Sequence, residues 1–201
     1  MKIDESAILD AAAAVFAEDG YAGARIDVIA ARAGVNKAML YYRVGDKKEL
    51  YRRVVLRGQA GFRDAVIGCM ESSSDAPETI TAVIERVSEL AFADGLLPSI
   101  ILRELAGGAR NLPEEGREGI LRLMTMVRSI VSMGVAEGAF RRIDPVALQF
   151  AVIGAVFTLS LTSALRSELN PTLPDPVAPE EASAALLDIF LHGILTESGV
   201  P

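Results

Sequence analysis

Apolar residues recur at helical spacing along almost the whole of this chain, and no segment alternates as a half-buried strand does. In the first segment Ile8, Ala12, Val15 and Phe16 share one face, and Gly20 follows as a C-terminal cap. The pattern predicts an all-α fold of about nine helices, over residues 6–19, 26–33, 37–43, 46–70, 78–93, 97–107, 114–137, 145–165 and 179–197.

Polar residues stand where several of these helices are predicted to begin. Asn36 precedes the third helix, and Asp46 precedes the fourth with Glu49 three residues later. Asp144 precedes Pro145 at the start of the eighth helix. Asn and Asp side chains accept hydrogen bonds from the first free backbone N–H groups of a helix, so these residues are typical caps. The segment "NPTLPDPVAP" before the last helix is predicted to be a Pro-rich loop.

The composition argues against several classes of protein. Cys69 and His192 are each the only residue of their type, so we expect no disulfide framework, no Cys/His zinc site and no other metal. No plausible nucleophile–base set is present, and no Gly-rich phosphate loop follows a strand. We therefore expect a protein that is not an enzyme and has no cofactor. The first residues lack the form of a signal peptide, which predicts a cytoplasmic protein.

Positive charge is concentrated in one short window of an acidic chain. The net charge of the whole chain is −7, yet residues 21–57 hold nine basic and three acidic residues. That window carries +6 and the rest of the chain carries −13. A local basic patch on an acidic body is typical of a protein that meets a polyanion at one end. Within the window, Arg52, Arg53 and Arg57 are expected to form a solvated helix face.

Residues 26–44 are predicted to form two short helices joined at "AGVN". Ile29, Ala30 and Leu40 are expected to pack the two helices together, and Gly34 can adopt the left-handed conformation that a tight turn requires. The second helix would then face outward, as the recognition helix of a helix-turn-helix does in a major groove. A plain helical hairpin with solvated charges is the alternative interpretation.

The longer pattern "ILDAAAAVFAEDGYAGARIDVIAARAGVNKAMLYYRVGDKKELY" resembles the N-terminal domain of the TetR family of transcriptional regulators. The matching features are "F-x-x-x-G-Y", "IA-x-x-AGV-x-K-x-x-LYY" and "K-x-EL". The resemblance implies a three-helix helix-turn-helix DNA-binding domain at residues 1–46 and a larger helical domain for ligand sensing and dimerisation at residues 47–201. The chain departs from the family pattern at Ala24 and Arg25, at Ala38 and Met39, and at Arg43 and Val44.

The resemblance also implies which residues face DNA. Lys37, Tyr42 and Lys47 would contact phosphates, and Met39 could touch a thymine methyl group. Tyr41 is as compatible with packing as with contact. The full set of predicted DNA-binding residues is Arg25, Asn36, Lys37, Ala38, Met39, Tyr41, Tyr42, Arg43 and Lys47.

Residues 145–165 carry no charge and are long enough to span a bilayer. Gln149 and several Ser and Thr residues interrupt this segment, and no aromatic or basic belt frames both of its ends, so no membrane partner is expected. Together with the last helix, it is expected to form a four-helix bundle between two subunits. The predicted dimer-interface residues are Phe150, Ile153, Phe157, Leu186, Ile189 and Phe190.

The resemblance also implies a small-molecule pocket. Arg103 and Glu104 lie inside an apolar helix, where a charge needs a partner or a ligand, and pairing with neighbouring residues is the alternative interpretation. Large apolar side chains at helical spacing are equally compatible with ordinary core. The candidate ligand-binding residues are Phe62, Phe92, Arg103, Met124 and Phe157.

Taken together, these features predict a ligand-responsive transcriptional regulator. The resemblance implies a repressor that binds a near-palindromic double-stranded DNA operator as a homodimer and is released by a small apolar effector. The alternative is a dimeric interaction or ligand-sensing protein of the same fold with lost or altered DNA binding.

Overall fold

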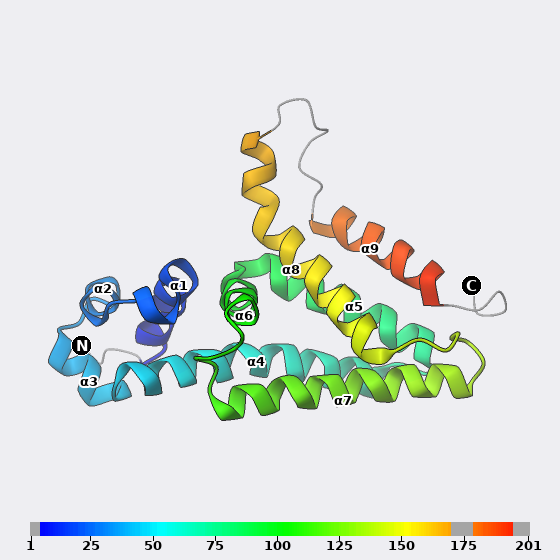
Figure 1. The fold of residues 1–201 in the computed structure, drawn as a ribbon, viewed down its shortest axis with the longest axis horizontal. Helices are drawn as coiled ribbons and strands as arrows, with labels where there is room; N and C mark the ends of the chain where they lie inside the picture. The colour runs from blue at the N-terminus through cyan, green and yellow to red at the C-terminus, as the bar shows by residue number, and fades with distance from the viewer. Residues whose placement is uncertain (1–4, 170–178, 195–201) are drawn as a thin grey trace. The chain divides into compact units, whose positions relative to one another are not determined.

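The computed structural model describes residues 5–169 and 179–194, and within these ranges every regular element is an α-helix (Figure 1). The predicted all-α fold is therefore confirmed for the described residues. The predicted loop at residues 170–178 and the end of the last predicted helix lie outside them. The helices are α1 (Glu5–Gly23), α2 (Ile26–Arg32), α3 (Lys37–Val44), α4 (Lys47–Ser72), α5 (Ala76–Asp94), α6 (Leu96–Ala106), α7 (Glu114–Ala136), α8 (Pro145–Leu169) and α9 (Pro179–Ile194).

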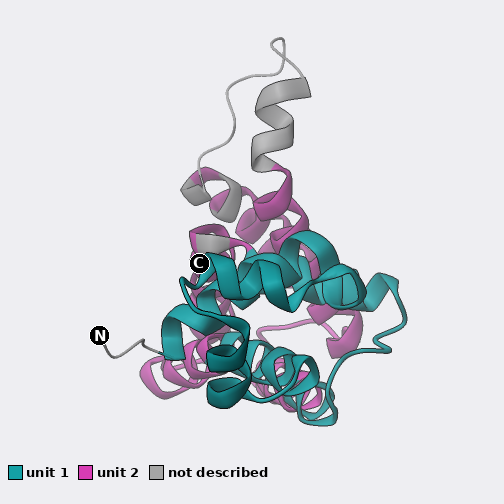
Figure 2. Ribbon diagram, turned by 90° about the vertical axis from the view of Figure 1, so that its left-hand side faces the viewer, with its two compact units in different colours: residues 1–60, 96–119 teal, residues 61–95, 120–201 magenta. Residues whose placement is uncertain are grey.

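The chain packs as two compact units, shown in different colours in Figure 2. Unit 1 comprises residues 1–60 and 96–119, and unit 2 comprises residues 61–95 and 120–201. Helices α4 and α7 each begin in unit 1 and end in unit 2. This division by packing differs from the expected functional boundary after residue 46, which stays a prediction.

In unit 1, α1 packs against α2, α3 and α6. Phe16 of α1 is almost fully buried, and its ring meets that of Tyr51 edge-on with centroids 4.8 Å apart. The ring of Tyr21 lies 4.9 Å from that of Tyr51. Leu40 and Val44 of α3 are fully buried, which the sequence predicted for Leu40. The three N-terminal helices therefore share a core with the start of α4.

Helix α1 bends at Gly20, whose φ of 70° lies in the left-handed region. The bend is accompanied by a contact from α6, where Arg103 donates hydrogen bonds to the carbonyl oxygens of Ala17 and Glu18 at 3.2 and 3.1 Å. A Cβ at position 20 would lie only 2.8 Å from Cδ of Arg103. Arg103 thus satisfies carbonyl groups near the end of α1, where a cation also interacts favourably with the helix dipole.

The arginines at the start of α4 form ion pairs inside unit 1, although the sequence predicted a solvated face. Arg53 pairs with Glu5 at 2.8 Å, and Arg57 pairs with Asp10 at 2.7 Å. Their partners lie on α1, some 47 residues away in sequence, so helical periodicity could not show them. These pairs link α4 to α1.

In unit 2, α5 packs against α8 and α9, and α8 packs against α9. The core is apolar, with Ile84, Ile130, Val156 and Ile194 almost fully buried. At the start of α8, the carboxylate of Asp144 accepts a hydrogen bond from the N–H of Val146 at 2.8 Å, which confirms the predicted cap.

Candidate nucleic-acid interface and effector cavity

Helices α2 and α3 form the helix-turn-helix that the sequence predicted. The turn between them contains Gly34 with a φ of 66°, and the N–H of Val35 donates to the carbonyl oxygen of Ala30 at 2.9 Å. Ile29, Ala30 and Leu40 are buried between the helices. A side chain at position 34 would meet no atom within 4 Å, so the left-handed backbone conformation alone favours glycine there.

Helix α3 is anchored by one narrow apolar stripe. Leu40 and Val44 are fully buried, whereas the other six residues of the helix are exposed. Tyr42 is 85% exposed and Tyr41 is 44% exposed. Asn36 caps the helix, because its side-chain oxygen accepts a hydrogen bond from the N–H of Met39 at 2.8 Å. A short helix held along one edge leaves its remaining surface available to a major groove.

The cations around α3 differ in what they contact. Lys37 and Arg43 are exposed and form no ion pair within the described residues. Arg25 is paired with Asp27 at 2.7 Å, and this hydrogen bond raises the pKa of the Arg25 guanidinium. Lys47 is half-buried, with its ammonium 3.3 Å from the carbonyl oxygen of Ala22 and 5.0 Å from the centre of the Tyr21 ring.

The predicted DNA-binding residues are thus all placed on the surface, although their contacts with DNA stay predictions. Eight of them are exposed, and Lys47 is half-buried. Glu49, two residues after Lys47, is not part of a reciprocal cap: its N–H donates to Asp46, whereas its carboxylate accepts hydrogen bonds from Arg52 and Arg53. Those two guanidinium groups lower the pKa of Glu49 to about 2.

A buried carboxylate lies behind the helix-turn-helix in unit 1. Glu104 of α6 accepts a hydrogen bond from the hydroxyl of Tyr51 at 3.0 Å and two from Asn111, at 3.1 and 3.2 Å. Burial, followed by the charge of Glu104, raises the pKa of the Tyr51 hydroxyl. Glu104 and Arg103 therefore both have partners inside unit 1. This is the alternative interpretation of these two charges, in which they pair with neighbouring residues.

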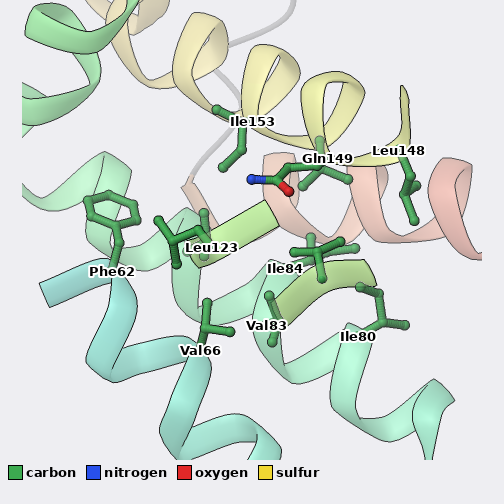
Figure 3. Close-up of a pocket in the computed structure, with 12 residues that line it drawn as sticks. Phe62, Val66, Ile80, Val83, Ile84, Leu123, Leu148, Gln149 and Ile153 are labelled. Atoms are coloured by element: carbon green, nitrogen blue, oxygen red, sulfur yellow. The ribbon is translucent and has the colours of Figure 1, made fainter. Parts of the chain in front are cut away.

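Unit 2 contains a partly open cavity of about 50 Å³ (Figure 3). It lies among residues of α4, α5, α7 and α8, and its lining is aliphatic apart from one phenyl ring and one amide. The lining residues are Phe62, Val66, Ile80, Val83, Ile84, Val87, Leu123, Val127, Leu148, Gln149, Val152 and Ile153. None of them is charged, so the cavity suits an apolar molecule.

Few of the candidate ligand-binding residues line this cavity. Phe62 does, and Phe157 packs edge-on behind it with ring centroids 5.7 Å apart. Phe92 and Met124 are half-buried and are not among the lining residues. Arg103 lies in unit 1, bonded to α1. Ligand binding by these five residues stays a prediction.

Sequence reasoning missed the contribution of α5 and of Gln149. The α5 residues Ile80, Val83, Ile84 and Val87 follow the i, i+3, i+4, i+7 spacing of an apolar helix face. Periodicity marks such a face without showing whether side chains or space lie opposite it. Gln149 had a clearer signal, because it is an amide in an uncharged helix.

The residues predicted at a dimer interface divide into two groups. Phe150 and Ile189 are 47% and 65% exposed, whereas Phe157 and Leu186 are buried within unit 2. The other two are half-buried, and one of them, Ile153, lines the cavity. The exposed members leave apolar surface on α8 and α9.

Two described helices, α7 and residues 145–162 of α8, are long and apolar enough to cross a membrane by length and composition alone. Helices packed into the core of a protein or into a subunit interface share these properties. The absence of a membrane partner stays a prediction.

The fold and the exposed α3 define a helix-turn-helix DNA-binding protein with an attached helical body. Residues 8–54 match the family model described as "Bacterial regulatory proteins, tetR family". The HTH-type transcriptional repressor SCO4008 of Streptomyces coelicolor is 34% identical over 135 residues, which cover 66% of this chain and 67% of that protein. The chain therefore belongs to the TetR family, and it is a transcriptional regulator.

The similarity to known proteins extends well beyond the N-terminal helices. The HTH-type transcriptional repressor NicS of Pseudomonas putida is 25% identical over 197 residues, covering 93% of this chain and 90% of the relative. The structure of the transcriptional regulator FadR from Bacillus subtilis, in complex with stearoyl-CoA, superposes with a TM-score of 0.69 and 20% identity. That alignment covers 98% of this chain and all of the other. At this identity the superposition shows a shared fold.

Proposed function

We propose that this protein is a repressor that binds a near-palindromic operator as a homodimer and releases it when a small apolar effector binds. Residues 1–46 would bind DNA, and residues 47–201 would sense the effector and dimerise, in the cytoplasm. The observation that carries the proposal is the exposed surface of α3, on which Tyr42, Lys37 and Arg43 are exposed. The two cations form no ion pair within the described residues. Both curated relatives described above are named as transcriptional repressors.

The contacts with DNA follow from the chemistry of these side chains. Lys37 and Arg43 offer positive charge to phosphates, and the hydroxyl of Tyr42 offers a hydrogen-bond donor. Ala38 and Met39 cannot donate a side-chain hydrogen bond, so their contribution is apolar contact with thymine methyl groups. The operator would therefore be read in part through methyl groups and through the shape of the DNA.

The apolar surface on α8 and α9 supports the proposed homodimer. Phe150 and Ile189 are large apolar side chains of these two helices that are 47% and 65% exposed. If these helices meet their copies, a four-helix bundle covers both side chains. Two copies of α3 placed about one DNA turn, roughly 34 Å, apart can then read two half-sites.

The cavity in unit 2 is the proposed effector site. Its uncharged, mainly aliphatic lining favours an apolar molecule. The FadR structure, solved with stearoyl-CoA, indicates that a protein of this fold can hold a molecule with a long hydrocarbon chain. An effector that binds better to a state in which the two copies of α3 are wrongly spaced lowers operator affinity by that difference in affinity.

The first experiment is a titration of the protein with its own upstream intergenic DNA and with a scrambled control, at several salt concentrations. We expect specific binding that weakens by about 0.9 log units per log unit of salt for each phosphate neutralised. In Lys37→Ala the slope should fall by about two for a dimer, since each subunit loses one phosphate contact. Arg63→Ala, which removes an exposed cation of unit 2, should leave the slope unchanged.

The outcomes separate the proposal from its alternative. If the protein binds no DNA even at low salt, DNA binding has been lost, and an interaction or ligand-sensing dimer of the same fold becomes the better description. If it binds DNA with equal slopes in the wild type and in Lys37→Ala, the assignment of α3 as the reading helix is wrong.

A further inference from the structure

Gln149 is the only polar side chain among the residues that line the cavity in unit 2 (Figure 3). It lies on α8, and its amide is drawn among the aliphatic side chains of Ile153, Leu123 and Ile84. The oxygen Oε1 is buried and accepts no hydrogen bond within the described residues. A buried acceptor without a donor destabilises the fold relative to one that is satisfied, so a bound donor would be favourable at this position.

Water is a poor partner for this oxygen. A buried water molecule usually makes two to four hydrogen bonds, and apolar cavities stay dry. Apart from the amide of Gln149, this cavity offers only hydrocarbon side chains. A water molecule bound there would leave much of its own hydrogen-bonding capacity unmet.

The charge of the lining limits the partner further. No lining residue carries a charge, so a carboxylate, a phosphate or an ammonium group would be buried without a counter-ion. The charged part of a coenzyme A group is therefore a poor fit to this cavity. A neutral molecule, most of which is hydrocarbon, meets the lining without that cost.

We propose that the cavity in unit 2 binds a neutral, mainly hydrocarbon molecule that carries a hydroxyl group, and that this hydroxyl donates its proton to Oε1 of Gln149. A hydroxyl is small and can both donate and accept a hydrogen bond, so it can pair with either the oxygen or the NH₂ group of an amide. The inference deepens the proposed function and rests on it, since it names the chemical class of the effector and the residue that selects it.

The size of the cavity sets the scale of the molecule. A volume of about 50 Å³ is well below the ~150 Å³ of an engineered apolar cavity that accepts benzene. As it stands the cavity holds a few carbon atoms, and a six-membered ring would require lining side chains to change rotamer. A short alcohol and a phenol therefore bracket the expected size.

The test compares probes that differ only in the group facing Gln149. Phenol and toluene have nearly the same shape, 1-butanol is a smaller alcohol, and benzoate adds a charge. Binding is measured in the full-length protein, without DNA, from the methyl NMR shifts of Ile80, Ile84 and Ile153. The methyl groups of Ile8 and Ile29, buried in unit 1, report any change outside the cavity.

The variant is Gln149→Met, which keeps a long unbranched side chain and removes the amide. We expect it to weaken phenol binding about two- to tenfold, the contribution of one hydrogen bond, and to leave toluene binding unchanged or tighter. Gln59→Met is the matched control: Gln59 is also a buried glutamine with an unpartnered Oε1, but it lies in unit 1. It should leave the affinity of both probes unchanged.

Several outcomes would overturn the inference. One is a ratio of phenol to toluene affinity that Gln149→Met does not change. Another is benzoate binding as tightly as phenol, and a third is the failure of both alcohols to shift the cavity methyl groups.

The inference about the site is separate from operator release. A hydroxyl preference that depends on Gln149, with no effect of any bound probe on operator affinity, would support the site and contradict the effector role. Release by a molecule whose action is the same in Gln149→Met would support the effector role and contradict the inference.

Discussion

Units 1 and 2 differ in what surrounds their buried polar groups, although each buries a glutamine oxygen that has no partner within the described residues, Gln59 in unit 1 and Gln149 in unit 2. In unit 1 the carboxylate of Glu104 accepts three hydrogen bonds, and Arg103 donates two to the carbonyls of α1. In unit 2 the amide oxygen of Gln149 is buried beside a cavity, and no donor in the part of the chain that the structure describes bonds to it. A satisfied polar network favours one arrangement of helices, whereas an unsatisfied group beside an apolar cavity leaves an acceptor that a bound molecule could satisfy. The contrast agrees with the proposed function, in which unit 1 presents the reading helix and unit 2 binds the effector.

The largest expected effect is a difference in stability between two variants. One removes a hydrogen bond in unit 1, and the other removes an unpartnered amide in unit 2. Tyr51→Phe keeps the ring in its aromatic cluster but deprives the Glu104 carboxylate of a donor. We expect it to lower the free energy of unfolding by about 1.5–3 kcal/mol, the range for hydrogen bonds to charged groups. Gln149→Met removes a group that makes no such bond, so it should be neutral or stabilising by about 1 kcal/mol. Urea unfolding followed by circular dichroism measures both.

The double variant Tyr51→Phe/Glu104→Leu is the control for the first half of this comparison. Replacing both members of a buried pair by apolar groups removes the unmet charge as well as the bond. It should therefore recover part of the stability that Tyr51→Phe loses. Equal losses from Tyr51→Phe and Gln149→Met would show that the two units do not differ in this respect.

A smaller effect should follow from adding one methylene group to the core of each unit. Val55 of unit 1 is fully buried, and a Cβ at Gly116 would lie 3.1 Å from its Cγ1, so space there is scarce. Val55→Ile is expected to destabilise by about 1–3 kcal/mol through overpacking. Val152 lines the cavity of unit 2, so Val152→Ile can place its extra carbon in open space and gain up to about 0.8 kcal/mol.

The same pair of variants tests the cavity as a binding site. Val152→Ile reduces the free space and should weaken the binding of phenol and toluene alike, whereas Val55→Ile should leave both affinities unchanged. Destabilisation of similar size by both variants would indicate that unit 2 is packed as tightly as unit 1.

The sequence predicted local features of the two units equally well. Gly34 was placed in the left-handed turn, and Asn36 and Asp144 were placed as caps, because each depends on residues within one helical turn. Leu40 was predicted to be buried for the same reason. The all-α fold followed from many such local patterns acting together.

Features that depend on distant residues were not predictable in this way. Arg103 donates a hydrogen bond to Ala17, which lies 86 residues away in sequence, and neither segment's sequence indicates this contact. Phe157 was assigned to a ligand site and to a dimer interface, and both assignments stay predictions; in the structure it is buried against Phe62 of its own unit. Periodicity identifies an apolar face, and packing decides whether the same chain, a second chain or a cavity lies opposite it.

The smallest effect concerns the ion pairs at the start of α4, which belong to unit 1 alone. Hydrogen bonds from Arg52 and Arg53 lower the pKa of Glu49 to about 2, below its ordinary value of 4.5. A carboxyl group with a lowered pKa in the folded state binds protons more readily when unfolded, so it stabilises the fold above its ordinary pKa. That contribution should be lost as the pH falls from about 5 towards 2.

Glu49→Gln removes this dependence. Because the carboxylate is about a third exposed, with 32% of its side chain accessible, we expect a difference of about 0.5–1 kcal/mol at neutral pH, as for other screened surface pairs. The difference between wild type and variant should shrink on acidification and should also shrink in high salt. Glu85→Gln, an exposed acid of α5 in unit 2, is the control and should show no such trend. A difference that persists unchanged at pH 2 would mean that Glu49 acts through packing. The polar contacts that stabilise unit 1 would then be those of Glu104 and Arg103.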